Sequence, residues 1–255
     1  MKRLTIVVPY RAREAHLNIF VQMVRAYFAR DKVDREIPYS VLVIEQEPGL
    51  PFNRGALKNI GFFLSKESSD YTCFHDVDYI PVWADYSWSD IPVAIVWYGA
   101  ESRPIRVSHR DRGVRHDLNK FYGGAALTPN EIFEKANGYT NANWGWGPDD
   151  LDLKHRFGAI GIEMGRRKGT FQPLDHDSEA YELDGSPSAA ARVNLKQLED
   201  RWKLGIDAPE DGLNNLRYRV LDRRKIPEGP VVERAATWEM VTVRLEMKPT
   251  GDKQP

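Results

Sequence analysis

Four short apolar runs, separated by segments with helical periodicity, most constrain what this chain can fold into. The runs are LTIVV (4–8), YSVLVIE (39–45), YTCF (71–74) and VAIVW (93–97), and each is typical of a strand buried on both faces. Apolar residues recur at helical spacing at positions 17, 20, 21, 24 and 28, and again at 57, 60 and 64. The alternation of strand and helix predicts an α/β fold with a parallel sheet and right-handed crossovers.

Three polar segments follow the first three predicted strands: PYRAR (9–13), EQEPGLPFNR (45–54) and HDVD (75–78). Ligands gather beyond the carboxyl ends of parallel strands, so we expect the segments to form one site. Asp76 and Asp78 point the same way on an extended chain and repel each other unless a cation or water lies beside them. A solvated strand end followed by a turn is the alternative explanation.

The chain lacks the glycine patterns with which common nucleotide-binding folds hold phosphate. No G-x-G-x-x-G follows the first predicted strand, and no G-x-x-x-x-G-K-[ST] occurs. A metal ion that bridges a carboxylate to a diphosphate is another such device, and Mg²⁺ and Mn²⁺ prefer oxygen ligands. The aspartate pair is therefore a candidate metal site.

Composition narrows the class of protein. With 255 residues, 42% of them apolar, the chain has enough material for a large buried core. Lys and Arg number 36 against 37 Asp and Glu, which gives no electrostatic reason to expect nucleic acid as a partner. A basic cluster between Arg103 and Lys120 is either a solvated loop or a contact for an anionic acceptor. The single cysteine, Cys73, excludes an internal disulfide and is expected in the core.

The first ten residues, MKRLTIVVPY, lead from two basic residues directly into a strand. They contain too few apolar residues for the core of a signal peptide, and far too few to cross a bilayer. The expected location is cytoplasmic, in a bacterial type of protein, with peripheral attachment to a membrane as the alternative.

A glycine pair lies within FYGGAALTPNEIFEKANGY (121–139). The segment predicts a strand that enters Gly123 and Gly124, then a helix with a capping box of Thr128 and Glu131 that ends at Gly138. The pair allows either close approach of a ligand to the backbone or a tight bend without a ligand.

The segment NANWGWGPDDLDLKHRFGAIG (141–161) contains two indoles separated by glycine. Pro148 predicts a helix start, which places Asp149 and Asp150 in the first turn, where the helix dipole stabilises negative charge. Helix capping alone explains the two acids. The indoles are better suited to a lid or a sugar-binding platform than to a core.

Six motifs occur in the order found in the β-1,4-galactosyltransferases, which this chain resembles: VPYRAR, FNRGALKNIGF, FHDVDYIP, FYGGAAL, NGYTNANWGWGPDDLD and GLNNLRYRV (212–220). The chain is most similar to the branch that galactosylates xylose in proteoglycan linkers. The resemblance implies a single-domain, Rossmann-like sheet of the glycosyltransferase A type. It assigns residues 1–221 to the catalytic domain and 222–255 to a C-terminal extension with a closing strand at 237–247.

The resemblance also implies an inverting transfer of galactose from UDP-galactose, with Mn²⁺ or Mg²⁺ as cofactor, to a xylose-like or lipid-linked sugar acceptor. Asp150 is then the general base that takes the proton from the acceptor hydroxyl. The donor-binding residues are Pro9, Arg11, Arg13, Phe52, Arg54, Asp76, Val77, Asp78, Gly124, Trp146 and Asp149. The acceptor-binding residues are Phe121, Trp146 and Leu151.

The implied metal ligands are Asp78 and His176. This chain departs from the family here, because Leu174 and Pro173 stand where relatives have a second histidine or a methionine ligand. The residues that could replace the missing ligand are Asp175 and Asp177, and either carboxylate would favour Mn²⁺ or Mg²⁺ over softer ions.

Three further departures bear on specificity. Asp149 is one methylene shorter than the family's glutamate, and Leu151 replaces an acid that often contacts the acceptor. Phe121 stands where relatives commonly have a tyrosine that influences the choice between galactose and N-acetylgalactosamine. The donor sugar therefore stays open between these two.

Two alternatives to a transferase remain. A metal-dependent phosphohydrolase acting on a nucleotide sugar also uses clustered aspartates, and a non-catalytic sugar-binding relative would retain the same motifs. Residues 191, 195, 198 and 202 recur at helical spacing in a late segment, which indicates core packing or, alternatively, a contribution to the acceptor site.

Overall fold

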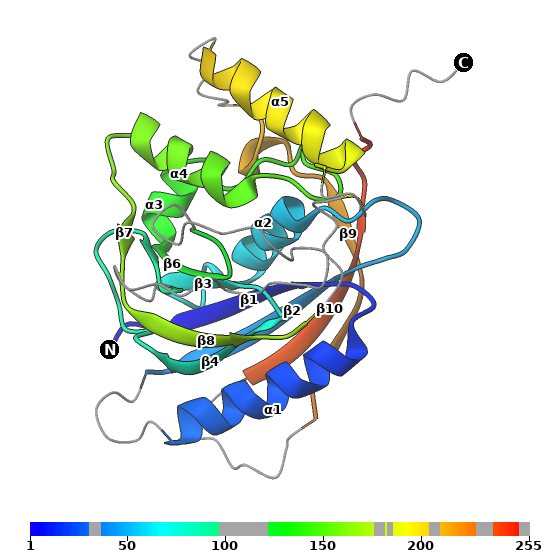
Figure 1. The fold of residues 1–255 in the computed structure, drawn as a ribbon. Coiled ribbons are helices and arrows are strands. Elements are labelled where there is room, and N and C mark those ends of the chain that lie inside the picture. Colours follow the sequence, from blue (N-terminus) through cyan, green and yellow to red (C-terminus); the bar gives the residue numbers. More distant parts are fainter. Residues whose placement is uncertain are drawn as a thin grey trace.

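The computed structural model describes residues 1–30, 37–96, 122–175, 182, 186–203, 210–227 and 237–249. The described residues form an eight-stranded sheet with the order β7-β5-β6-β3-β1-β2-β10-β9 and a two-stranded sheet of β4 and β8 (Figure 1). The strands are β1 (Leu4–Tyr10), β2 (Tyr39–Gln46), β3 (Tyr71–His75), β4 (Tyr79–Ala84), β5 (Val93–Ala94), β6 (Ala125–Pro129), β7 (Gly165–Arg166), β8 (Gly169–Pro173), β9 (Tyr218–Lys225) and β10 (Thr237–Leu245). The helices are α1 (Glu14–Arg30), α2 (Arg54–Ser65), α3 (Asn130–Lys135), α4 (Asp149–Ala159), α5 (Ala189–Lys203) and the 3₁₀ helix η1 (Leu213–Asn215).

The centre of the large sheet is parallel, as the apolar runs predict. Strand β1 pairs in parallel with β2 and β3, and β2 pairs in parallel with β10. Strands β6 and β9 run antiparallel to their neighbours β3 and β10. The predicted strands at 4–8, 39–45 and 71–74 are confirmed. Of the run at 93–97, only Val93–Ala94 is a strand, and residue 97 lies outside the described residues.

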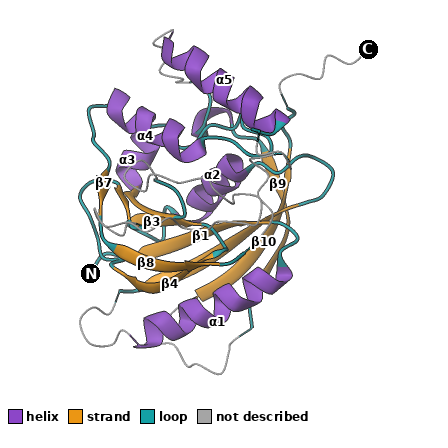
Figure 2. Ribbon diagram, in the orientation of Figure 1, coloured by secondary structure: helices purple, strands orange, loops and turns teal. Residues whose placement is uncertain are grey.

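Helices cover both faces of the sheet because the buried strands are apolar on both. Alternate residues of β1 point to opposite faces. Leu4, Ile6 and Val8 share a core cluster with α1, whereas Val7 belongs to a second cluster with α2 and α4. Figure 2 shows α1 on one side of the sheet and α2, α3 and α4 on the other, with α5 beyond α4. No described helix combines the length and apolarity that a membrane span requires.

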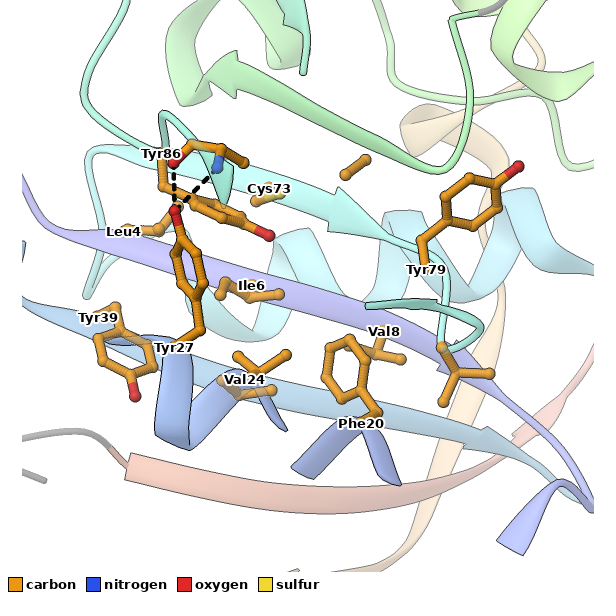
Figure 3. Packing of buried hydrophobic residues seen from close by; sticks show 14 of the residues in the cluster. Leu4, Ile6, Val8, Phe20, Val24, Tyr27, Tyr39, Cys73, Tyr79 and Tyr86 are labelled. Atoms are coloured by element: carbon orange, nitrogen blue, oxygen red, sulfur yellow. Dashed lines mark hydrogen bonds between the residues drawn. The ribbon is translucent and has the colours of Figure 1, made fainter. Parts of the chain in front are cut away.

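A buried tyrosine joins α1 to the small sheet. The Tyr27 hydroxyl donates to the Ala84 carbonyl at 2.6 Å and accepts from the Ala84 amide at 2.9 Å. Figure 3 shows this pair of bonds above the side chains of Ile6 and Val24. Cys73 lies in the same cluster without exposure, as predicted, and burial raises the pKa of its thiol.

The small sheet brings a distant segment beside the aspartate pair. Strand β4 begins at Tyr79, directly after Asp78, and Tyr79 pairs with Pro173 at the end of β8. Directly after β8, the Leu174 amide donates to the Asp78 carbonyl at 2.7 Å. The chain that leads towards residue 176 therefore passes the aspartate pair.

The capping box predicted at Thr128 is wrong. Thr128 belongs to β6, where it pairs with Thr72, and α3 begins at Asn130 without a side-chain cap. The strand also follows the glycine pair instead of entering it, because β6 begins at Ala125. Helix α3 ends at Lys135, three residues before the predicted Gly138. Asn137 and Gly138 then have φ of +60° and +65°, and the Gly138 amide closes the turn by donating to the Phe133 carbonyl at 3.0 Å.

The C-terminal strands complete the main sheet. Strand β10 pairs with β2 over seven positions and with β9 on its other side. The domain boundary expected between residues 221 and 222 falls inside β9. The division into a catalytic domain and an extension stays a prediction. The residues on either side of its boundary belong to the same sheet.

Candidate functional site

The three polar segments that follow β1, β2 and β3 lie together at the carboxyl end of the sheet. The Arg11 guanidinium donates to the Leu50 carbonyl at 2.6 Å and lies 5.2 Å from the centre of the Phe52 ring. Arg13 forms an ion pair with Asp78 at 3.4 Å, and Arg54 forms one with Asp76 at 3.6 Å. Each segment therefore contacts another, as the parallel topology predicts.

Arg54, the first residue of α2, lies at the centre of the acidic cluster. Its Nε and Nη2 both lie 3.0 Å from Asp149 Oδ2, and Nη2 lies 3.9 Å from Asp150 Oδ2. A further hydrogen bond of 3.3 Å reaches the carbonyl of Gly147 in the tryptophan-containing segment. One guanidinium thus connects the residues after β3 to the first turn of α4.

Burial and charge oppose each other in this cluster. Burial lowers the pKa of Arg54, but the carboxylates of Asp149, Asp76 and Asp150 together raise it well above its ordinary value. Burial raises the pKa of Asp149, and the nearby Arg54 and a hydrogen bond from Asn143 partly offset that effect. The Asn143 amide donates to Asp149 Oδ1 at 2.7 Å. Asp149 is therefore held by protein groups on both oxygens.

Lys58, one turn after Arg54 on α2, is a site residue that the sequence motifs did not reveal. Its Nζ lies 3.3 Å from Asp150 Oδ1 and 3.6 Å from Asp76 Oδ1. Residues four apart share a helix face, so the spacing from Arg54 was the signal that could have identified it.

Asparagine side chains hold the loops around α2. Asn53 accepts from the Ala56 amide at 2.9 Å as the N-cap and donates to the Asn141 carbonyl at 2.8 Å. Asn59 donates to the Tyr139 carbonyl at 2.8 Å and accepts from the Tyr139 amide at 2.9 Å. An asparagine directly before a predicted helix is a capping signal that sequence reasoning missed here.

The two indoles of WGWG have different environments. Trp144 is buried in the core cluster with α2 and α4, which corrects the prediction that both suit a lid, and Trp146 is half-buried. Asn194 of α5 donates to the carbonyls of Trp144 at 3.2 Å and Trp146 at 2.7 Å. Gly145 has a φ of +76° and donates to the Phe52 carbonyl at 2.7 Å. The backbone of this segment is thus attached to two elements.

Helix α4 begins at Asp149, as Pro148 predicts, and a buried ionic network holds it against α5. Asp152 accepts from Arg156 at 2.8 Å and from Arg201 of α5 at 2.9 Å. Ala191 and Leu198 of α5 are buried, which agrees with the core-packing explanation of that helical pattern. The network fixes the helix whose first turn carries Asp149 and Asp150.

Only part of the candidate metal site is described. Asp78 is 7% exposed, whereas Asp175 is exposed. His176 and Asp177 lie outside the described residues. The described ranges contain no group of three His, Cys, Asp or Glu residues that could hold a metal ion. The two carboxylates that are described fit the hard oxygen ligands that Mn²⁺ and Mg²⁺ prefer.

Of the remaining predicted site residues, Val77, Gly124 and Leu151 lie beside the aspartates. Pro9 is in β1, and Val77 is buried between the two acids. The Gly124 carbonyl accepts from the Asp76 amide at 2.7 Å, and the φ of Gly124 is +77°. Leu151 is 39% exposed in the first turn of α4. Phe121 and the basic cluster from 103 to 120 lie outside the described residues.

Two family profiles match this chain. Residues 1–87 match the N-terminal region of glycosyl transferase group 7, and residues 103–177 match the N-terminal domain of galactosyltransferase. Together the two regions cover more than half of the chain.

Curated relatives give the same family. The chain is 30% identical over 234 residues to β-1,4-galactosyltransferase 7 of Homo sapiens, covering 89% of this chain and 64% of the relative. It is 30% identical over 228 residues to β-1,4-galactosyltransferase 4 of Rattus norvegicus, covering 87% of this chain and 60% of the relative. The chain thus spans less than two thirds of the length of these relatives.

Solved structures show the fold. The catalytic domain of Drosophila β-1,4-galactosyltransferase 7 in complex with xylobiose is 22% identical, with a TM-score of 0.73 over 97% of this chain and 96% of that one. A mutant of the same fly enzyme in complex with manganese, UDP-Gal and xylobiose has a TM-score of 0.71 over the same shares. The predicted α/β fold of the glycosyltransferase A type is therefore confirmed.

Proposed function

Because this chain belongs to the glycosyltransferase group 7 family of β-1,4-galactosyltransferases, we propose that it is an inverting, metal-dependent glycosyltransferase. It moves galactose or N-acetylgalactosamine from a UDP-sugar to a hydroxyl of a sugar acceptor and forms a β-linkage. The observation that carries the proposal is the cluster of Asp76, Asp149 and Asp150 around Arg54 at the carboxyl end of the sheet.

The donor lies across the ends of β1, β2 and β3 in this proposal. Arg11, Arg13 and Phe52 hold the uridine and diphosphate, and the 5.2 Å contact between Arg11 and the Phe52 ring supports a shared surface for the nucleotide. Arg54 belongs to the same set, Asp76 and Val77 contact the nucleotide, and Asp149 reaches the donor sugar. The Gly124 carbonyl accepts from the Asp76 amide at 2.7 Å, and this contact supports a position for the Gly124 backbone beside the donor sugar.

Asp78 and His176 are the proposed ligands of Mn²⁺, with Mg²⁺ as the alternative cation and Asp175 or Asp177 as a third ligand. The bond from the Leu174 amide to the Asp78 carbonyl supports this set, because it brings the segment before residue 176 to Asp78. When bound, the cation neutralises the charge that develops on the leaving diphosphate. Arg13, 3.4 Å from Asp78, adds positive charge on the same side.

Asp150 is the proposed general base. Inversion requires a carboxylate that takes the acceptor proton on the face opposite the leaving group. Asp150 lies in the first turn of α4, the end of a helix where negative charge is stabilised by the dipole. Its neighbour Leu151 is 39% exposed and gives the acceptor an apolar contact, together with Trp146 and Phe121.

Replacing Asp150 by Asn tests the assignment of the base. We expect turnover to fall by roughly 10²- to 10⁴-fold, while binding of UDP-sugar and Mn²⁺ is retained. Asp200→Asn is the matched control, because Asp200 is an exposed acid of α5 that pairs with Lys196. Unchanged turnover in Asp150→Asn would exclude it as the base. Phosphate release from the donor without any acceptor would favour a phosphohydrolase instead.

Calorimetry of UDP binding tests the metal site separately. Asp78→Asn or His176→Ala should abolish the part of the UDP affinity that depends on Mn²⁺. Equal UDP affinity of the unmodified chain with Mn²⁺ and with a chelator would refute the metal assignment.

The acceptor is best identified by mass spectrometry. Xylose-like and lipid-linked acceptors are screened with UDP-galactose and UDP-N-acetylgalactosamine, and the product mass identifies the sugar transferred. A cytoplasmic location stays a prediction of the sequence pattern, and fractionation of the source cells tests it.

A further inference from the structure

Lys58 is a lysine with almost no exposure to solvent. Its side chain is 2% exposed, although it lies in the middle of α2 among apolar neighbours. Lysine is almost never fully buried unless it is paired, because the charged ammonium loses its hydration. The identity of its partners therefore indicates what the buried charge is for.

Both anionic partners of Lys58 belong to the acidic cluster. Nζ lies 3.3 Å from Asp150 Oδ1 and 3.6 Å from Asp76 Oδ1, and it also lies 4.8 Å from the centre of the Tyr139 ring. The ring contact adds a modest cation–π attraction. The ammonium therefore connects the residue after β3 to the first turn of α4.

The contacts of Asp150 show why this connection matters. Arg54 approaches Asp150 Oδ2 only to 3.9 Å, and its shorter contacts go to Asp149. The ion pair between the Lys58 ammonium and Asp150 Oδ1, at 3.3 Å, is the shorter of the two that Asp150 forms with these cations. Among the described residues, the buried Oδ1 of Asp76 has no hydrogen-bond partner, and Lys58 is the cation that faces it. Without Lys58, the Arg54 guanidinium, 3.6 Å from Asp76 Oδ2 and 3.9 Å from Asp150 Oδ2, would be the remaining described cation that pairs with both carboxylates.

We propose that Lys58 is a positioning residue for the reaction, one that holds Asp150 and Asp76 in fixed relative orientation. The inference rests on the proposed function, since it assigns Lys58 a role through the general base. Lys58 is covered by its partners and acts without touching the substrate. Lys58 holds Oδ1 of Asp150, and Oδ2 is therefore the oxygen that faces the acceptor hydroxyl in this proposal.

A double-mutant cycle of Lys58→Met and Asp150→Asn tests this role. We expect Lys58→Met to lower kcat by about tenfold or more, which corresponds to about 1.4 kcal/mol, with the UDP affinity in Mn²⁺ changed by less than about threefold. In the Asp150→Asn background, Lys58→Met should have little further effect, because residues that act as one unit are not additive. Independent, multiplying effects on kcat would overturn the proposal, as would an unchanged kcat in Lys58→Met.

Lys66→Met is the matched control on the same helix. Lys66 pairs with Glu134 at 2.7 Å, away from the acidic cluster, so its loss removes an ion pair of α2 without touching Asp150. Its kcat should equal that of the unmodified chain.

Removing a buried cation leaves the two acids paired, within the described part of the chain, only with Arg54 and can prevent folding. Should Lys58→Met not fold, the cycle is repeated with Lys58→Gln, whose amide still donates to a carboxylate, and the same non-additivity is expected. The proposed function fails separately, when the unmodified chain transfers no sugar or when Asp150→Asn is fully active.

Discussion

His75, the last residue of β3, makes the stability of the site depend on pH. The ring is fully buried directly before Asp76. Its Nδ1 lies 2.9 Å from the Asp76 carbonyl, which can only accept, so Nδ1 carries the proton and Nε2 accepts from the Tyr86 hydroxyl at 3.0 Å. Burial lowers the pKa of His75 from 6.5 to about 4, against smaller opposing effects of the Asp76 carbonyl and carboxylate.

The sign of the effect follows from proton binding. Between these two pKa values the unfolded chain binds a proton at His75 and the folded chain does not, so the free energy of unfolding rises with pH. This contribution to stability is fully present above the pKa of His75 in the unfolded chain. It is lost as the pH falls towards the pKa of His75 in the folded chain. The full shift corresponds to about 3 kcal/mol, of which about 2 kcal/mol is lost between about pH 7 and about pH 5.

Urea unfolding followed by tryptophan fluorescence measures this loss at both pH values, without metal or donor. In His75→Gln the titrating ring is absent, so the variant should lose about 2 kcal/mol less than the unmodified chain over the same interval. His155→Gln is the control, since His155 is exposed on α4. Equal losses in the unmodified chain and in His75→Gln would refute the reasoning.

Two further predictions concern packing and the tryptophan-containing segment. In Gly61→Ala the new Cβ overlaps the Val7 methyl groups, so the free energy of unfolding measured in urea should fall by about 1–3 kcal/mol. The control is Gly158→Ala, whose Cβ lies in open space on α4. Its free energy of unfolding should stay the same or rise by up to about 1 kcal/mol. Asn194→Leu removes the hydrogen bonds to both indole-bearing residues, so proteolysis near residue 146 should accelerate while α5 remains helical by circular dichroism. Equal cleavage rates would show that this side chain does not hold the segment.

The sequence predicts the central strands well because burial on both faces leaves a continuous apolar signal. LTIVV and YSVLVIE became β1 and β2 with small extensions. The pairing of β4 with β8 could not be read in this way, since those strands come from segments some 90 residues apart and only the fold aligns them. The misassigned Thr128 shows the limit of local rules, because pairing with Thr72 outweighed a capping pattern.

Site residues that belong to a local sequence motif were predicted. Site residues whose partners are distant in the sequence were missed. Asp149 and Asp150 lie in the first turn of α4 because proline fixes that turn, as expected. Lys58 was missed because its neighbours in sequence are those of a buried helix face, and only contacts with Asp76 and Asp150 explain its charge. Trp144 was assigned to a lid or a sugar-binding platform, but the core cluster around α2 accommodates its ring.

The position of β10 has a consequence for biosynthesis. Its partner β2 ends at residue 46, yet β10 begins at residue 237, so a nascent chain carries an incomplete sheet while the residues between these two strands are translated. Until β10 emerges from the ribosome, β2 presents bare amides and carbonyls beside buried valines, which is a template for association with other chains. A fragment that stops before residue 237 should therefore precipitate on expression, and the intact chain should fold late and benefit from chaperones.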